Sequence, residues 1–255
     1  MLALTHIPSP NLDHGQRTHV AREVVDYEIA LRQHAGYCRM LQECGAEVVT
    51  LDVNCDQPDS TFIEDTTVVL DEIAVLASMG TAARRMEPSR IEPELRKHRE
   101  IERIKAPATL EGGDVLRIGR KILIGLSERT NISGVQAFEK IVSRFGYRVL
   151  TVPVRQCLHL KTACTALPDG RLLTNPAWLN LNSLHDFDTL AVPDDEPWAA
   201  NTLPINGRVL ISSDNPHTTE MLLRLGFDVC TLSLSEFAKV EGCVTCLSLL
   251  CQTDQ

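Results

Sequence analysis

The chain lacks the features that mark several broad classes of protein. No apolar run approaches the roughly 20 residues of a membrane span, so we expect no membrane partner. The stretch "MLALTHIPSPNLDHG" is apolar for only four residues, which is not typical of a secretory signal. Positive charge is in deficit, with a formal net charge of −9, which argues against nucleic acid as the main partner. Nine scattered cysteines, an odd number, fit a reducing compartment, so we expect a cytoplasmic protein.

No linker rich in proline, glycine and serine divides the sequence, so a single domain over residues 1–255 is expected. Within it, a unit of helix, strand, polar loop and β-hairpin occurs five times. The predicted helices cover residues 27–45, 90–103, 133–146, 175–187 and 217–226. The predicted strands that follow them cover 47–53, 101–106, 147–154, 188–194 and 227–234. The last hairpin, over 243–251, is incomplete, and residues 1–9 could supply its missing strand.

Five such units predict an α/β fold, a five-bladed pseudo-symmetric propeller closed by the N-terminal strand. An open α/β sheet also alternates helices and strands and is the alternative. In a closed ring, the five polar loops would meet at one mouth. These loops hold most of the candidate reactive residues, which are Asp59, Glu64, Asp65, Glu111, Asp114, His159, Lys161, Glu241 and Cys246.

The types of residue in these loops suit one kind of chemistry. A thiolate is a strong nucleophile, and a nearby imidazole can activate it and shuttle protons. A carboxylate beside the imidazole fixes its tautomer and supports its charged form. Further clustered carboxylates need a cation, and a guanidinium with several N–H donors suits paired carboxylates.

The segment "CVTCLSLLC" holds three cysteines, and a C-x-x-C pair suggests zinc or redox chemistry. No second C-x-x-C or Cys/His knuckle accompanies it. In a strand, Cys243 and Cys246 would also point to opposite faces, so we expect neither metal nor redox use. Taken alone, Cys246 fits a packed core cysteine better than a nucleophile.

Several motifs, in order and spacing, resemble the dimethylarginine dimethylaminohydrolases. They are "FIEDTTVV", "ARR", "TLEGGDVL", "GLSERTN", "CLHLKT" and "KVEGCVTCLSL". These enzymes belong to the guanidine-modifying pentein superfamily, which has a five-bladed α/β propeller. The resemblance covers nearly the whole chain. It implies hydrolysis of an N-methylated arginine to citrulline and a methylamine, with a small-molecule guanidine as substrate and no metal or other cofactor. A homodimer is left open.

The resemblance also implies a role for each matching residue. Cys246 matches the nucleophile that forms a covalent thiouronium intermediate, His159 the general acid/base, and Glu111 the carboxylate that orients the histidine. The substrate-binding positions are Asp59, Glu64 and Asp65 around the guanidinium, Arg84 and Arg129 at the α-carboxylate, Gln16 in the covering loop, and Val240 and Glu241 before the nucleophile.

Two departures from the family pattern put the exact substrate in question. Gln16 stands where a bacterial relative has Leu, and Glu241 where relatives commonly have Asp. Lys161 differs from arginine deiminases, which have an acid there, and Arg84 and Arg129 argue against agmatine. A deiminase or amidinotransferase acting on another guanidine is one alternative. A catalytically inactive propeller that binds a guanidine or a partner is the other.

Overall fold

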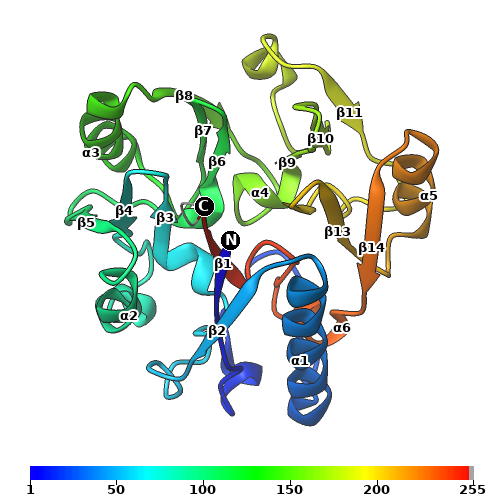
Figure 1. Cartoon of the computed structure of the whole chain (residues 1–255), viewed down its shortest axis with the longest axis horizontal. Helices are drawn as coiled ribbons and strands as arrows, with labels where there is room; N and C mark the ends of the chain where they lie inside the picture. The colour runs from blue at the N-terminus through cyan, green and yellow to red at the C-terminus, as the bar shows by residue number, and fades with distance from the viewer. Residues whose placement is uncertain (253–255) are drawn as a thin grey trace.

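The computed structural model describes residues 1–252, and five three-stranded sheets surround a central axis in it (Figure 1). In each sheet an antiparallel pair of strands is joined by a third strand that runs parallel to the middle one. In sheet order the strands are β15 (Ser248–Cys251), β1 (Leu2–His6), β2 (Glu47–Leu51); β3 (Thr67–Val69), β4 (Ile73–Leu76), β5 (Glu100–Arg103); β6 (Val115–Ile118), β7 (Lys121–Leu126), β8 (Arg148–Pro153); β9 (Cys164–Ala166), β10 (Leu172–Thr174), β11 (Thr189–Ala191); and β12 (Leu203–Ile205), β13 (Arg208–Ser212), β14 (Asp228–Leu232).

The first and last strands close the ring. β1 pairs antiparallel with β15, from Leu2 opposite Cys251 to Thr5 opposite Ser248. Strand β1 accordingly lies near the centre of Figure 1. The predicted propeller and its closure by the N-terminal strand are confirmed. Residues 253–255 of the predicted single domain lie outside the described part.

Apolar clusters join each sheet to both of its neighbours. Successive residues of a strand point to opposite faces, so one strand contributes to two clusters. In β1, Ala3 packs with Leu210 of β13, whereas Leu4 packs with Leu76 of β4. Three further clusters join the second sheet to the third, the third to the fourth and the fourth to the fifth. Five cores between five sheets therefore make the ring continuous.

Helices connect the second and third strands of most sheets on the outside of the ring (Figure 1). α1 begins after Asp26, whose carboxylate accepts the Ile29 N–H at 3.0 Å, and it ends before Gly45, which has a left-handed φ of +84°. The helices are α1 (Tyr27–Glu43), α2 (Glu87–Leu95), α3 (Ile132–Val142), α4 (Leu160–Ala163), α5 (Pro216–Arg224) and α6 (Ser235–Ala238), and the 3₁₀ turns are η1 (Leu12–His14), η2 (Ile63–Thr66), η3 (Ala82–Arg84), η4 (Gly112–Asp114), η5 (Ser143–Phe145) and η6 (Leu181–Leu184). No helix in the described chain is long and apolar enough to cross a bilayer.

Two predicted helices and one predicted strand differ from the structure. The helix over 90–103 is instead α2, and residues 100–103 form strand β5. The helix over 175–187 is reduced to the turn η6, because the Asn180 side chain accepts the Asn182 N–H at 3.2 Å and competes with helical hydrogen bonds. In 243–251 only β15 is a strand, and residues 244–247 form turns before it.

Candidate active site

Three loops from different parts of the ring bring a thiol, an imidazole and a carboxylate to one cavity. His159 immediately precedes α4, Glu111 precedes η4, and Cys246 lies in the turn before β15. All three side chains line the same cavity. The structure therefore brings together residues that are up to 135 positions apart in the sequence (246 minus 111).

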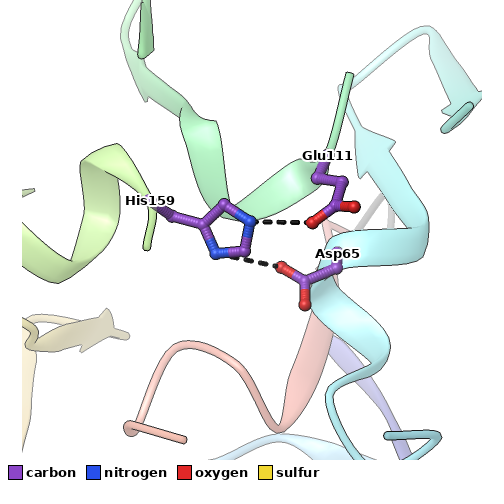
Figure 2. Close-up of side chains that lie close together, drawn as sticks. All are labelled: Asp65, Glu111 and His159. Carbon is purple, nitrogen blue, oxygen red and sulfur yellow. Dashed lines mark hydrogen bonds and ion pairs between the residues drawn. The ribbon is translucent and has the colours of Figure 1, made fainter. Parts of the chain in front are cut away.

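The His159 ring lies between two carboxylates (Figure 2). Its Nε2 is 2.8 Å from Glu111 Oε2, and its Nδ1 is 3.7 Å from Asp65 Oδ1. Burial alone would lower the pKa of His159, but the charges of Asp65 and Asp114 and the bond to Glu111 outweigh it and raise the pKa to about 9. The ring is thus a cation at neutral pH, ready to give up a proton.

The backbone around His159 is fixed by the "EGGD" segment. Asp114 Oδ1 accepts the N–H of Leu160 at 2.9 Å, and Glu111 Oε1 accepts the N–H of Gly80 at 2.9 Å. A Cβ on Gly113 would lie 2.6 Å from His159 Nδ1, so only glycine leaves room for the ring. Asp114 and Gly113 therefore position the imidazole.

Cys246 is partly exposed to the cavity, and its thiol is held neutral. Contact with the Cys243 thiol, burial, and the negative charges of Glu64 and Asp65 together raise the pKa of Cys246 well above its ordinary value. The Cys243 thiol contributes most to this rise in pKa.

Asp59 and Asp65 supply the negative wall of the cavity. Both are buried. Burial outweighs the Arg84 charge and raises the pKa of Asp59, whereas the charges of His159 and Arg84 overcome burial and lower that of Asp65. Asp65 Oδ1 is buried and has no hydrogen-bond partner within residues 1–252, which leaves an acceptor for an N–H group.

Arg84 lies at the cavity with its guanidinium already occupied. Nη1 donates to Asp65 at 2.6 Å, Nε and Nη2 donate to Glu87 at 3.1 and 2.9 Å, and Nη2 also reaches the Phe62 carbonyl at 2.9 Å. These bonds hold the Asp65 carboxylate in place. A direct bond from Arg84 to a substrate carboxylate would have to replace one of them and stays a prediction.

The N-terminal loop covers the cavity through three contacts. Gln16 Oε1 accepts from Arg129 Nη1 at 2.8 Å, and the Gln16 N–H donates to Asp59 at 3.0 Å. The Glu241 carboxylate accepts the backbone N–H groups of Thr18, at 2.8 Å, and of His19. Glu241 therefore anchors the covering loop. The enclosed volume is about 30 Å³, enough for about two water molecules, so a larger ligand requires this loop to move.

The candidates Asp114 and Lys161 do not line this cavity. All but one of the residues to which the family resemblance gives a role do line it. The exception is Glu64, whose carboxylate bonds Lys161 Nζ at 2.5 Å and faces a separate cavity of about 200 Å³. Sequence reasoning missed Phe62, Leu158 and Thr162, which also line the site. All three stand within the motifs "FIEDTTVV" and "CLHLKT", but Phe62 and Leu158 carry no chemical signal of their own.

Two further features border the site. One group of described residues could hold a metal ion. It consists of Asp65, Glu111 and His159, whose possible ligand atoms all lie within 4.8 Å of one another. A second cavity, of about 260 Å³, is lined by Trp198, Leu234 and Cys243 among others. Glu241 lines both cavities.

A family model, curated relatives and solved structures all indicate the same family for this chain. Residues 9–165 match the family model described as "N,N dimethylarginine dimethylhydrolase, eukaryotic". An N(G),N(G)-dimethylarginine dimethylaminohydrolase of Streptomyces coelicolor is 40% identical over 97% of this chain and 95% of its own length. The enzyme of that name from Pseudomonas aeruginosa is 34% identical, over 88% of this chain and 89% of its own.

Solved structures agree in fold. A His-to-Gly mutant of a dimethylarginine dimethylaminohydrolase, as an adduct with S-methyl-L-thiocitrulline, superposes with a TM-score of 0.93 at 32% identity, covering 97% of this chain and 98% of its own. A Cys-to-Ser mutant of the Pseudomonas aeruginosa enzyme complexed with citrulline gives 0.90 at 32%, with 97% of each chain covered. Since a relative 40% identical and a solved structure with a TM-score of 0.90 each match 97% of the chain, the chain belongs to the dimethylarginine dimethylaminohydrolase family.

Proposed function

We propose that this protein hydrolyses an N-methylated arginine, either asymmetric dimethylarginine or monomethylarginine, to citrulline and a methylamine. One observation carries the proposal. A protonated His159, held between two carboxylates, lines the same small cavity as the Cys246 thiol. Asp65, whose Oδ1 has no hydrogen-bond partner within residues 1–252, and the buried Asp59 supply the negative charge that a guanidinium needs. The family relatives that carry the same name support this assignment.

The covalent step uses Cys246 as nucleophile. The negative wall disfavours the thiolate in the empty site, and a bound guanidinium reverses that effect because it adds a positive charge beside the sulfur. The thiol releases its proton to solvent water, and the thiolate attacks the central guanidinium carbon. His159 then donates a proton to the substituted nitrogen of the tetrahedral species. The C–N bond breaks, a methylamine leaves, and the S-alkylthiouronium remains on Cys246.

Hydrolysis then releases the product. His159, now neutral, takes a proton from a water that attacks the same carbon. The C–S bond breaks, and the proton of the new hydroxyl group passes to the departing sulfur. Citrulline and the Cys246 thiol form, and His159 is again protonated. Glu111 keeps the imidazole oriented throughout through its 2.8 Å bond to Nε2. Within this scheme Asp59 and Asp65 hold the guanidinium.

The rest of the substrate would lie under the N-terminal loop. Arg129 bonds neutral acceptors, Gln16 and Thr18, which a substrate α-carboxylate can replace with a stronger charged pair. Val240 and Glu241 would frame the substrate from the opposite loop. Glu64, which faces Lys161, would act on the site through its charge rather than by contact.

Turnover measured on free, monomethylated and dimethylated arginine, with Cys246→Ser as the control, tests the proposal. We expect citrulline from a methylated substrate and none from the variant. A preference for free arginine would identify a deiminase. Transfer of the amidino group to an added amine would identify an amidinotransferase, and binding without turnover an inactive guanidine-binding propeller.

A cytosolic location and a homodimer are also parts of this proposal. The scattered cysteines support the location. Sedimentation equilibrium at several protein concentrations tests the dimer, and a mass of 28.3 kDa at every concentration would identify a monomer instead.

A further inference from the structure

Cys243 and Cys246 form the two ends of one tight turn. The Cys246 N–H donates to the Cys243 carbonyl at 3.2 Å, and the Cys243 N–H lies 3.4 Å from Cys246 Sγ. A turn with this hydrogen bond brings the Cα atoms of its first and fourth residues within about 7 Å. A disulfide needs Cα atoms about 4.4–6.8 Å apart. The expectation that a strand would point these side chains to opposite faces is therefore wrong.

Small molecules can reach the two thiols through two separate cavities. Cys246 lines the reaction cavity, and Cys243 lines the neighbouring cavity of about 260 Å³. Both are partly exposed, whereas Cys157, Cys164 and Cys251 are buried. A hydroperoxide, which is little larger than water in its simplest form, could therefore reach the pair.

We propose that Cys243 is a resolving thiol that captures the oxidised form of Cys246 as an intramolecular disulfide. The oxidant is a hydroperoxide. The Cys246 thiolate attacks one oxygen of hydrogen peroxide, the O–O bond breaks, and a sulfenic acid and hydroxide form. The hydroxide takes up the proton that the thiol had released and becomes the first water. The Cys243 sulfur then attacks the sulfenic sulfur, the S–S bond forms, and the hydroxyl leaves with the Cys243 proton as a second water. Two thiols lose two electrons, and one peroxide is reduced to two waters.

This site protects the reactive sulfur because the disulfide can be reduced again. Without a resolving partner, a sulfenic acid is oxidised further to sulfinic acid, which a dithiol cannot reverse. Oxidation should be faster at high pH, since the thiolate and not the thiol attacks the peroxide. The loss of activity on oxidation rests on the proposed role of Cys246, but the disulfide can be detected without any activity.

The experiment exposes the full-length protein to hydrogen peroxide, removes the excess, and divides each sample for peptide mapping and for dithiothreitol treatment. One tryptic peptide, which begins at Val240, carries Cys243, Cys246 and Cys251. In the wild type we expect this peptide to lose two hydrogens and to give no fragments between residues 243 and 246. We expect citrulline formation to fall at least tenfold and to recover after reduction.

Cys243→Ala separates the two cysteines. Because the Cys243 thiol also raises the pKa of Cys246, the activity of this variant is compared with that of its own unoxidised sample. We expect oxidation to remove that activity irreversibly and to leave sulfinic acid on Cys246. Cys243→Ser provides the same comparison if the alanine variant folds poorly by circular dichroism. Cys230→Ser is the matched control, because Cys230 is also partly exposed and contacts another thiol, that of Cys44, yet lines neither cavity. It should behave as the wild type does.

Two results would overturn the proposal. One is a wild-type peptide without a link between residues 243 and 246 after inactivation. The other is equal recovery of Cys243→Ala and wild type on reduction. If the link forms but the unoxidised protein releases no citrulline, the disulfide stands and the proposed hydrolase function fails, so the two failures can be told apart.

Discussion

Replacing Glu111 by Gln should lower the pKa of His159 without changing the shape of the site. Glu111 uses one oxygen for the Gly80 N–H and the other for His159 Nε2. In the variant, the amide oxygen can keep the Gly80 bond, and the NH₂ group then faces Nε2. An amide NH₂ can only donate, so Nε2 must become the unprotonated acceptor. The substitution therefore favours the neutral imidazole.

The size of the shift follows from the loss of one charge at 2.8 Å. An opposite charge at such range typically moves a pKa by about 1–3 units, or about 1.4–4 kcal/mol. From about 9 in the wild type, the pKa of His159 should fall to about 6–8. General acid–base catalysis contributes about 10²–10⁴-fold to a rate, which bounds the loss of kcat.

Proton NMR titration of the histidine ring protons measures this pKa directly. A His159→Gln sample identifies the resonance among the eight histidines, because that resonance disappears in it. Glu139→Gln, on the exposed face of α3, is the matched control and should leave the midpoint unchanged. A wild-type midpoint in Glu111→Gln would refute the account of how the imidazole is charged.

The remaining predictions concern charge in and around the cavity. The pH midpoint for alkylation of Cys246 should fall when a non-hydrolysable guanidinium ligand binds, and a midpoint that rises would contradict the role of the negative wall. Arg84→Met should destabilise the fold by about 3–5 kcal/mol in urea unfolding, because Asp65 and Glu87 lose their buried partner; a change below about 1 kcal/mol would contradict this. Folding raises the pKa of His159, so protonated His159 stabilises the fold by up to about 3 kcal/mol. This contribution is complete below about pH 6.5 and is lost as the pH rises through about 9. His159→Gln should flatten that part of the curve of unfolding free energy against pH. Dialysis against a chelator should leave turnover unchanged, and a loss that zinc restores would assign a metal to the Asp65, Glu111 and His159 cluster.

Much of the fold could be predicted because its repeat is local. Strands and hairpins follow from apolar alternation and turn residues, and the incomplete hairpin at 243–251 pointed to β1 as its partner. The prediction of a helix over 175–187 was wrong because it rested on the spacing of apolar residues. The side chain of Asn180 forms a local hydrogen bond that favours a turn.

The candidate site was predictable in composition but not in detail. Polar residues after each strand indicated which loops meet, and the family motifs implied their roles. Sequence could not show that Arg84 is fully engaged by Asp65 and Glu87, or that Glu64 turns toward Lys161, because both depend on side-chain contacts between distant loops. Nor could it show that the residues before β15 form a turn, which brings Cys243 against Cys246.

Mass spectrometry of the protein quenched in acid during turnover of dimethylarginine tests the central claim most directly. We predict a covalent adduct on the peptide that carries Cys246, at a level that falls to zero in Cys246→Ser together with citrulline release. Citrulline formation by Cys246→Ser at the wild-type rate, or an adduct on another residue, would contradict the claim that this sulfur attacks the substrate.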